Sequence, residues 1–342
     1  MTRLKVAILG GTGYGGMELA RLLLAHPHVE VTAVTSRTST KPLADTWPHL
    51  RGFTSLCFSQ ETPEALRALA ASNDILFQAK PHGVSAAQTP GLLDQAPRLK
   101  VIDLSGDFRL KDPSQYEAWY GLPHPAPTRL REAVYGLPEC GHREAIRRAR
   151  LVANPGCHAS ATILALWPLA RAGLLAGRVG VSSITGSSGS GSEPSKGTHH
   201  PERFMNLKAY KPLKHQHLPE IVAALGPDAR VDFVPHSAPI SRGIHVTAFA
   251  PVRGGAAAVS EAFQQAYTDE PFVRLVAEPP EVRSVVGTAM ADVHVTHADG
   301  LALVTVAIDN LGKGMAGTAV QNMNLVAGLD ESTGLRLPGL GL

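Results

Sequence analysis

The amino-acid sequence predicts an α/β protein that begins with a parallel sheet. Short apolar runs occupy residues 4–9, 29–35, 74–78 and 99–104, and a helical pattern covers residues 17–25 after the first run. Alternation of this kind is typical of a parallel sheet with crossover helices. The chain has 342 residues, of which 44% are hydrophobic, so it is long enough for two ordinary domains.

A glycine-rich turn joins the first apolar run to the first helical pattern. Gly10, Gly13 and Gly16 have the spacing G-x-x-G-x-x-G, a variant of the dinucleotide-binding fingerprint. Glycines at these places allow a sharp turn and let a pyrophosphate approach the start of the helix. The alternative is a tight turn without a ligand. The strand-turn-helix context favours a nucleotide site.

The end of the second apolar run indicates which nucleotide binds. A site for NAD usually has an acidic residue here, which holds the ribose hydroxyls. This chain has Ser36, Arg37 and Ser39 instead. Hydroxyls and a guanidinium suit a 2′-phosphate, so the sequence favours NADP. The alternative is an ordinary polar loop with a solvated Arg37.

A thiol marks the start of the second part of the chain. Cys157 ends the turn Asn154-Pro155-Gly156 and precedes a helical pattern at residues 158–166. The first turn of a helix has unpaired N–H groups and a partial positive charge, which stabilise a thiolate and an oxyanion. We therefore predict a nucleophilic cysteine. The alternative is a buried cysteine that only begins a helix.

A strand at residues 179–185 follows, and then a Gly/Ser loop at 186–192 and a polar stretch at 198–203. The loop is either a linker or a place where backbone amides meet an anionic substrate. Arg242 precedes another apolar strand, where it would clamp a phosphate or carboxylate or form a structural ion pair. A glycine-rich turn at residues 309–317 leads into a helical pattern and resembles a second ligand-facing loop.

A histidine precedes the next helical pattern. Pro219 is suited to open that helix, and Glu220 lies in its first turn. We expect His217 to face out of the turn as a general acid/base oriented by Glu220. The alternative is a surface or capping histidine. Metal binding by His199, His200, His215 and His217 is disfavoured because their spacing matches no zinc pattern.

The composition argues against several classes of protein, namely disulfide-rich, nucleic-acid-binding and membrane proteins. The chain has three cysteines and a formal net charge of +3, with scattered Lys and Arg residues. These features indicate reduced thiols, with Cys57 and Cys140 structural, and no binding of nucleic acid. No run is long enough for a membrane span, and the start does not read as a signal peptide. We expect a cytoplasmic protein with no metal and no membrane partner.

The motifs taken together resemble the N-acetyl-γ-glutamyl-phosphate reductase family. The resemblance covers nearly the whole chain in order. It is carried by residues 10–16, 35–37, 81–85, 101–110, 135–139, 154–157, 217–220 and 309–314.

The resemblance implies a Rossmann NADP-binding domain plus an α+β catalytic and oligomerisation domain of the semialdehyde-dehydrogenase type. The first would span residues 1–156 and be completed by 315–342, and the second would span 157–314. It also implies that Cys157 attacks an acyl phosphate and forms a thioester, which NADPH reduces to a semialdehyde. His217 matches the family's acid/base histidine and Glu220 its neighbouring carboxylate.

The implied binding residues fall into two sets. The cofactor would be bound by Gly10, Thr12, Gly13, Tyr14, Gly15, Gly16, Ser36, Arg37, Ser39, Pro81, Gly189, Asn310, Lys313 and Gly314. The substrate would be bound by Arg109, Asn154, Ser188, His200, Arg203, His217 and Arg242.

Two departures bear on the substrate. Arginine-pathway members usually have Tyr-Pro-Thr after the cysteine, whereas this chain has His158-Ala159-Ser160. Those members also tend to have a basic residue after a Ser-Gly-Ala-Gly loop, whereas in this chain Ser192 and Glu193 follow the loop at residues 188–191. Both changes resemble the lysine-biosynthesis branch, which reduces α-aminoadipyl 6-phosphate attached to a small acidic amino-group carrier protein.

A basic surface would suit that carrier. The candidate residues are Lys196, Arg203, Lys208, Lys211 and Lys214, and the alternative is that they are ordinary solvated side chains. We therefore take the carrier-linked reductase of lysine biosynthesis as the first interpretation and the arginine enzyme as the second. A non-catalytic NADP-binding sensor is a remote third. The resemblance also implies a homodimer or homotetramer.

Overall fold

The computed structural model describes residues 3–341, which form two compact units. Unit 1 runs from the start of the described chain to Pro138 and also contains His142–Pro155 and Met315–Arg336. Unit 2 contains Glu139–Gly141, Gly156–Gly314 and the described residues from Leu337 onward. Residues 1–2 and 342, which end two predicted domain segments, lie outside the described residues.

This division differs from the expected one at three places. The segment Glu139–Gly141, the residue Gly156 and the chain after Leu337 belong to unit 2, although the sequence-based boundaries put them in the nucleotide domain. Contacts of their side chains and backbone decide their membership, and these contacts cannot be deduced from local patterns. The backbone of Leu340, for example, donates to the carbonyl of Val286.

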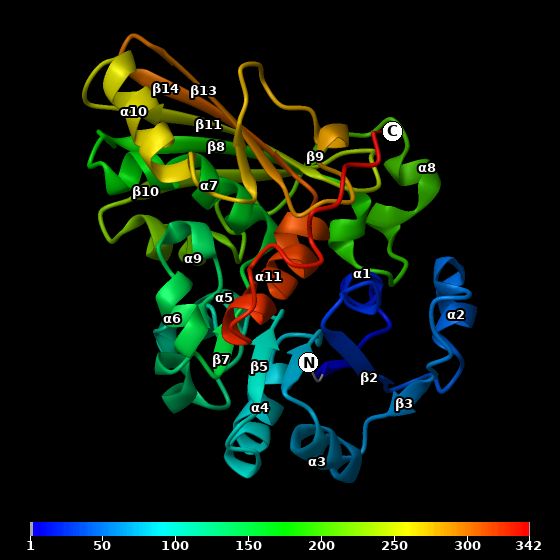
Figure 1. Cartoon of the computed structure of the whole chain (residues 1–342). Helices are drawn as coiled ribbons and strands as arrows, with labels where there is room; N and C mark the ends of the chain where they lie inside the picture. The colour runs from blue at the N-terminus through cyan, green and yellow to red at the C-terminus, as the bar shows by residue number, and fades with distance from the viewer. Residues whose placement is uncertain (1–2, 342) are drawn as a thin grey trace. The chain divides into compact units, whose positions relative to one another are not determined.

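Unit 1 is built on a parallel sheet of seven strands in the order β3-β2-β1-β4-β5-β7-β6. In Figure 1 its strands run from blue to green. The predicted parallel sheet is therefore confirmed. The strands are β1 (Leu4–Leu9), β2 (Val29–Ser36), β3 (Phe58–Gln60), β4 (Ile75–Gln78), β5 (Lys100–Asp103), β6 (Val134–Tyr135) and β7 (Leu151–Ala153).

The helices of unit 1 include two packed pairs, α1 with α11 and α3 with α4. Residues such as Ile8, Leu76 and Ile102 are fully buried, as expected for strands in a covered parallel sheet. The helices are α1 (Tyr14–Leu24), α2 (Leu43–Thr46), α3 (Pro63–Ser72), α4 (Val84–Gln95), α5 (Pro113–Tyr120), α6 (Arg143–Arg148) and α11 (Gly317–Val326).

Unit 2 contains a mixed sheet of seven strands in the order β12-β13-β14-β11-β8-β10-β9. β8 pairs with β10 in parallel and with β11 in antiparallel fashion, so the chain enters the sheet at its middle. The strands are β8 (Arg178–Thr185), β9 (Lys208–Ala209), β10 (Arg230–Ser237), β11 (Ile244–Pro251), β12 (Val273–Leu275), β13 (Ala291–Ala298) and β14 (Leu301–Ile308).

Helices α7 (Cys157–Arg171) and α10 (Ala256–Tyr267) pack against each other and against the strands of this sheet (Figure 1). Burial alternates along β8 and β10, which is typical of a sheet with one covered face. The remaining helices are the short α8 (His200–Arg203) and α9 (Leu218–Leu225), which packs on α7. Within residues 3–341, no helix is long and apolar enough to cross a membrane.

Candidate active site

The glycine-rich turn of unit 1 has the geometry expected of a nucleotide loop. Gly10 has φ +79°, and a Cβ there would lie 2.9 Å from the carbonyl oxygen of Ala79. A Cβ on Gly16 would lie 2.4 Å from the carbonyl oxygen of Gly11. Both positions therefore require glycine, which brings the turn against the strand ends and the helix against the turn.

The start of α1 fits a pyrophosphate. Gly13 is the N-cap residue and forms no side-chain capping bond, so no side chain occupies the place where an anion would meet the helix N–H groups. Thr12 and Tyr14 are exposed beside it, and Gly15 packs closely on the sulfur of Met315. The turn is therefore compatible with the predicted cofactor, because no side chain at Gly13 blocks the start of the helix.

The end of β2 is organised by a hydroxyl. The side chain of Ser36 accepts hydrogen bonds from the backbone N–H groups of Thr38 and Ser39, at 3.1 and 3.0 Å. This turn leaves Arg37 exposed, as a residue that contacts a 2′-phosphate would need to be. The roles of these side chains toward NADP stay predictions.

A buried ion pair that was not predicted from the sequence lies beside this turn. Glu61, which follows β3, forms a 2.8 Å ion pair with Lys80, which follows β4. Glu61 also accepts a hydrogen bond from the side chain of Thr35 on β2. A carboxylate does therefore stand near the end of β2, contrary to our expectation, but it comes from the neighbouring strand and is neutralised by Lys80.

Lys80 is placed by the turn that precedes it. Its Cγ lies where a side chain on Gly10 would go, and burial lowers the pKa of its ammonium. Pro81, a predicted cofactor residue, is exposed next to it. The signal that could have found Lys80 is its position directly after an apolar run, at the carboxyl edge where parallel sheets bind ligands.

Two predicted substrate residues of unit 1 are held by the backbone. The guanidinium of Arg109 donates to the carbonyl oxygens of Asn154 and Leu104, at 2.8 and 3.0 Å. The amide of Asn154 donates to the carbonyl oxygen of Met315 at 3.0 Å and accepts from Asn322 at 3.1 Å. Both residues are buried, so they fix the chain just before Cys157.

In unit 2, Cys157 is the first residue of α7. Its N-cap, Gly156, makes no side-chain capping bond, which leaves the first N–H groups of the helix for an oxyanion. Gly314 packs directly on the cysteine, because a Cβ there would lie 2.8 Å from the Cβ of Cys157. Gly314 belongs to a π-helical turn at Gly312–Ala316, a feature that is frequent at functional sites.

His217 and Glu220 meet at Gly156. Glu220 accepts a 3.2 Å hydrogen bond from the N–H of Gly156, and its other oxygen lies 3.7 Å from Nε2 of His217. A Cβ on Gly156 would lie 2.4 Å from that same Nε2. The structure therefore brings the three predicted catalytic residues around one glycine.

One expectation about this group was wrong. His217 does not face out of its turn but is buried, with 8% of its surface exposed. The reason is that the ring of His215 packs against the ring of His217, with centroids 4.6 Å apart. Nδ1 of His215 also accepts a hydrogen bond from the backbone N–H of His217. Pro219 and Glu220 at the start of α9 are buried as well.

A second histidine cluster lies beside the catalytic group. His158 lies 2.6 Å from the hydroxyl of Ser183 through Nδ1 and 2.8 Å from the hydroxyl of Tyr210 through Nε2. Burial, and then His215, lower the pKa of His158 to about 3. Burial also lowers the pKa of His215 to about 4, so both rings are neutral at physiological pH.

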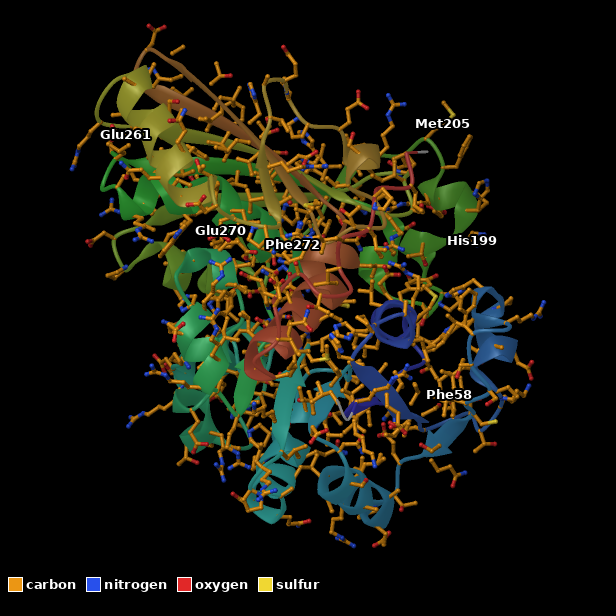
Figure 2. The ribbon with its side chains drawn as sticks, in the orientation of Figure 1. Phe58, His199, Met205, Glu261, Glu270 and Phe272 are labelled. Atoms are coloured by element: carbon orange, nitrogen blue, oxygen red, sulfur yellow. The ribbon has the colours of Figure 1, made fainter. Side chains whose placement is uncertain are left out.

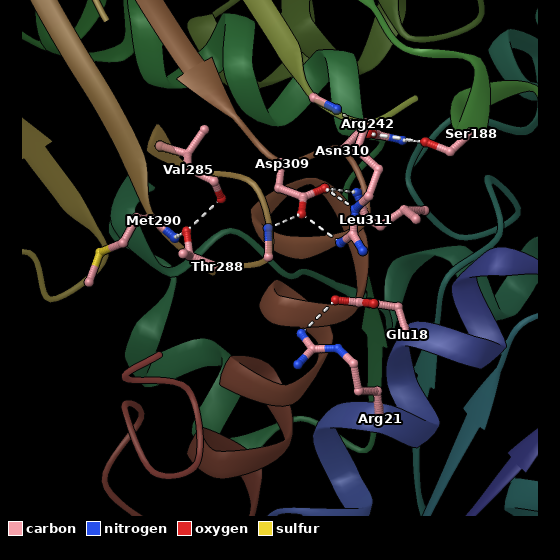
Figure 3. A network of polar contacts seen from close by, with 12 residues as sticks. Glu18, Arg21, Ser188, Arg242, Val285, Thr288, Met290, Asp309, Asn310 and Leu311 are labelled. Atoms are coloured by element: carbon pink, nitrogen blue, oxygen red, sulfur yellow. Dashed lines mark hydrogen bonds and ion pairs between the residues drawn. The ribbon is translucent and has the colours of Figure 1, made fainter. Parts of the chain in front are cut away.

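Asp309 organises a polar network that Figure 3 shows in close-up. Its two oxygens accept from Nε and Nη2 of Arg242 at 3.2 and 2.6 Å, and it also accepts from the N–H of Gly287 at 2.6 Å. Asn310 accepts from the N–H of Gly243 and donates to Ser188 at 3.0 Å. Of the two interpretations of Arg242, the structure thus contains the ion pair.

Lys313 has a buried partner. Its Nζ lies 2.5 Å from Glu139 and 5.5 Å from the ring centroid of Phe272, and both charged side chains are fully buried. Its predicted contact with the cofactor therefore competes with an existing ion pair. No local pattern indicated this pair, because its members are far apart along the chain.

The predicted basic surface divides in two. Its lysines, at positions 196, 208, 211 and 214, are exposed, whereas Arg203 is buried. Gly189 and His200 are also exposed, and His200 stacks on Phe204 with ring centroids 5.3 Å apart. Figure 2 labels His199 and Met205 in this part of unit 2. Arg203 therefore does not belong to the surface that the sequence suggested.

A further feature is the geometry of the side chains that could bind a metal. Within the described range, 3–341, no group of three or more His, Cys, Asp or Glu side chains is arranged to hold a metal ion. Cys57 is exposed and Cys140 is buried, and neither they nor Cys157 form a disulfide among the described residues. The histidines that we considered as a cluster separate into exposed ones, His199 and His200, and buried ones, His215 and His217.

Two family models match this chain. Residues 5–149 match the family described as semialdehyde dehydrogenase, NAD binding domain, and residues 157–310 match semialdehyde dehydrogenase, dimerisation domain. The second match supports the predicted oligomer. Among solved structures, aspartate semialdehyde dehydrogenase II from Vibrio cholerae has a TM-score of 0.71 at 19% identity, covering 96% of this chain and 99% of that one. This likeness confirms the fold.

Proteins that are similar over nearly the whole chain identify the family more narrowly than the domain matches do. A protein of Nitrosococcus oceani named N-acetyl-gamma-glutamyl-phosphate reductase is 45% identical, covering 97% of this chain and 98% of the relative. A protein of the same name from Pseudomonas syringae pv. syringae is 46% identical, covering 98% and 99%. This chain therefore belongs to the N-acetyl-gamma-glutamyl-phosphate reductase family of semialdehyde dehydrogenases and is an NADP-dependent oxidoreductase.

Proposed function

We propose that this enzyme reduces an acyl phosphate to a semialdehyde through a thioester on Cys157. The observation that carries the proposal is the meeting of His217 and Glu220 at Gly156, the residue before the thiol. A nucleophile at an uncapped helix start, with a base beside it and a carboxylate to orient that base, is the set that acyl transfer requires.

In the proposed reaction, Cys157, the start of α7 and His217 each have a separate role. The thiolate of Cys157 attacks the acyl carbon, the C–O bond to phosphate breaks, and phosphate leaves with the electron pair. The N–H groups at the start of α7 stabilise the oxyanion. NADPH, when bound, supplies the hydride that reduces the thioester. The reduced carbon carries an oxyanion, which His217 protonates to give a thiohemiacetal on Cys157. As the C–S bond breaks, His217 takes that proton back, the electron pair goes to sulfur, and the semialdehyde and the thiolate are released.

For the substrate, we put N-acetyl-γ-glutamyl phosphate first. The similar proteins that carry this name cover almost the whole chain at 45% and 46% identity, which reverses the order that the sequence alone suggested. On this proposal the enzyme acts in arginine biosynthesis. We further propose a cytoplasmic homodimer or homotetramer, in line with the dimerisation-domain match.

A carrier-linked α-aminoadipyl 6-phosphate of lysine biosynthesis is the second candidate. The observation in its favour is the stretch 204–214 of unit 2, in which Lys208, Lys211 and Lys214 are exposed together with apolar side chains. Phe204 and Met205 are 61% and 84% exposed there. Such a surface is suited to a small acidic protein. His158, in place of the tyrosine that is usual in arginine-pathway members, is buried and lies 2.8 Å from the hydroxyl of Tyr210, which belongs to the same stretch.

The test is the reverse reaction, phosphate-dependent reduction of NADP, run with two free aldehydes. N-acetylglutamate semialdehyde and N-acetyl-2-aminoadipate semialdehyde differ by one methylene, which a pocket discriminates by about 1–3 kcal/mol. A higher kcat/KM for the shorter aldehyde supports the arginine reaction. Activity that appears only when the longer substrate is attached to an acidic carrier supports the lysine reaction.

The chemical step is tested by Cys157→Ser. This variant should lose turnover and keep its affinity for NADP, because the thiol lies in unit 2 and the glycine turn in unit 1. Trapping the acyl group by mass spectrometry should label Cys157 in the wild type alone. Turnover by the serine variant would contradict the covalent mechanism, and a wild type that binds NADP without any turnover would favour the sensor.

A further inference from the structure

Arg203 is a buried cation whose forked edge has no partner in the described part of the chain. The residue ends α8 and is 9% exposed. Its Nε and Nη2 atoms are buried and have no hydrogen-bond partner among residues 3–341. A guanidinium stays charged in proteins, so its burial without an anion is costly. Burial does lower its pKa, and the neighbouring Tyr210 only partly offsets that effect.

The same edge of arginine is used elsewhere in unit 2. Arg242 binds both oxygens of Asp309 through Nε and Nη2, and Arg274 binds both oxygens of Asp292 in the same way, at 2.6 and 2.9 Å. Arg203 presents this two-nitrogen edge without a carboxylate, although it is less exposed than either of the others. Its edge matches a planar carboxylate better than a single charge.

The position of Arg203 relates it to the catalytic group. Tyr210 lies near enough to Arg203 and to Cys157 for both to influence its ionisation. Burial and then Cys157 raise the pKa of Tyr210, while Arg203 lowers it. Tyr210 also lies 2.8 Å from Nε2 of His158, the residue after the thiol. Arg203 and Cys157 are therefore both neighbours of Tyr210.

On these grounds we infer that Arg203 binds the α-carboxylate of the substrate. The inference rests on the proposed function, and both candidate substrates carry this group. In N-acetyl-γ-glutamyl phosphate the α-carboxylate is free, and in a carrier-linked substrate only the amino group is blocked. Recognition of the α-carboxylate would therefore serve either reaction and would orient the acyl phosphate toward Cys157.

Binding requires a local movement, because Nε and Nη2 are covered. The segment that follows Arg203 is suited to such a movement. Met205, Lys211 and Leu213 all have positive φ, between 42° and 60°, and among the described non-glycine residues only Asp299 shares this property. Conformations of this kind are strained and are common at ligand clamps.

The experiment compares two aldehydes in the reverse reaction. N-acetylglutamate semialdehyde carries the α-carboxylate, and 4-acetamidobutanal has hydrogen in its place. Arg203→Gln should lower kcat/KM about 100-fold for the first, mainly through KM, and less than about 3-fold for the second. Arg203→Lys keeps the charge without the fork, so it should fall between. The control, Arg253→Gln, replaces an exposed arginine of the same unit and should change neither.

The melting temperature separates binding from a structural role. Removing an uncompensated buried charge should leave the melting temperature of ligand-free Arg203→Gln unchanged or higher. A clearly lower value, with equal loss of activity toward both aldehydes, would assign Arg203 to the fold. Unchanged activity of the variant toward both aldehydes would also overturn the inference.

A wild type inactive toward free and carrier-attached aldehydes alike would refute the proposed function and leave the carboxylate question to binding. N-acetyl-L-glutamate, N-acetyl-L-2-aminoadipate and their α-amides would then be compared by thermal shift. The inference holds if an acid raises the melting temperature of the wild type, its α-amide does not, and Arg203→Gln loses the effect. It fails if the wild type shows no shift, or if acid and amide act equally on wild type and variant.

Discussion

The carboxylate of Glu220 accepts a hydrogen bond from the backbone N–H of Gly156 at 3.2 Å. One side chain on α9 therefore holds both the residue before the nucleophile and, 3.7 Å away, the ring of His217. A carboxylate in this position sets the distance between base and thiol through the backbone. The geometry of the site consequently depends on two small features, an acceptor at Glu220 and a missing side chain at Gly156.

Replacing Gly156 by alanine should disable the enzyme without unfolding it. The new Cβ would lie 2.4 Å from Nε2 of His217 and 2.7 Å from a Glu220 oxygen, so the histidine has to move. A displaced base lowers kcat by about 100-fold or more. Steady-state kinetics and the melting temperature test this. The matched control is Gly177→Ala, whose Cβ meets nothing closer than 3.8 Å; equal kcat values for the two variants would contradict the prediction.

Glu220→Gln should lower kcat about 10–100-fold while the fold persists. The amide oxygen can still accept from Gly156, so the backbone stays in place, but the negative charge beside His217 is lost. Stopped-flow measurement of thioester formation would report the effect directly. Glu278→Gln, which changes an exposed carboxylate of the same unit, should behave as the wild type. Full activity of the Glu220→Gln variant would show that the charge of Glu220 is not needed.

Arg37→Ala should weaken NADP far more than NAD. The guanidinium is exposed at the end of β2, beside the turn that Ser36 organises, and a 2′-phosphate is the group that distinguishes the two cofactors. We expect the dissociation constant for NADP to rise about 10–100-fold. Titration by fluorescence quenching measures both affinities, with Arg51→Ala as an exposed control in unit 1. Equal losses for NADP and NAD would remove the phosphate argument.

Because the ring of His158 is buried in its neutral form, the free energy of unfolding should fall as the pH drops below about 6.5, the pKa of an unfolded histidine. Its pKa is about 3 in the folded state because of burial, and that of His215 is about 4. Between these values and the unfolded value, the unfolded chain binds protons that the folded chain does not, so stability rises with pH. At pH 5 the cost from His158 is about 2 kcal/mol.

Denaturant unfolding at pH 7 and at pH 5 measures this cost. His158→Gln should lose less stability than the wild type over that interval, whatever its stability at pH 7. His49→Gln, which changes an exposed histidine, serves as the control and should lose as much as the wild type. If the wild type and His158→Gln lost the same free energy, the neutral buried state of His158 would be excluded.

Features that depend on neighbours in sequence were predictable. Gly16 is required by its contact with Gly11 in the same strand-turn-helix, and Gly10 has a positive φ in that turn, so the glycine spacing alone indicated the turn. Cys157 begins a helix whose apolar pattern is visible in the sequence, and α7 extends five residues beyond the predicted end at 166, to Arg171. The short strands β3, β6 and β7 were missed because two or three residues form no pattern.

Features that join distant segments were not predictable. Glu61 and Lys80 meet because β3 and β4 both end at the same edge of the sheet, which requires the strand order to be known. The stretch that contains Arg203 has lysines at irregular spacing, so nothing distinguished the buried cation from the exposed ones. His217 was expected at the surface because the packing of His215 against it is not visible in sequence.

The buried pair of Glu139 and Lys313 also constrains how the polypeptide is made. Its members are 174 residues apart, and the segment that carries Glu139 lies between two stretches of unit 1. During synthesis, that segment emerges long before its lysine, so unit 2 cannot close while the chain is still growing through residue 312. Long-range closure of this kind slows folding and exposes intermediates. A recombinant fragment that starts at Gly156 would lack this carboxylate altogether, and we expect it to be a poor substitute for the intact chain.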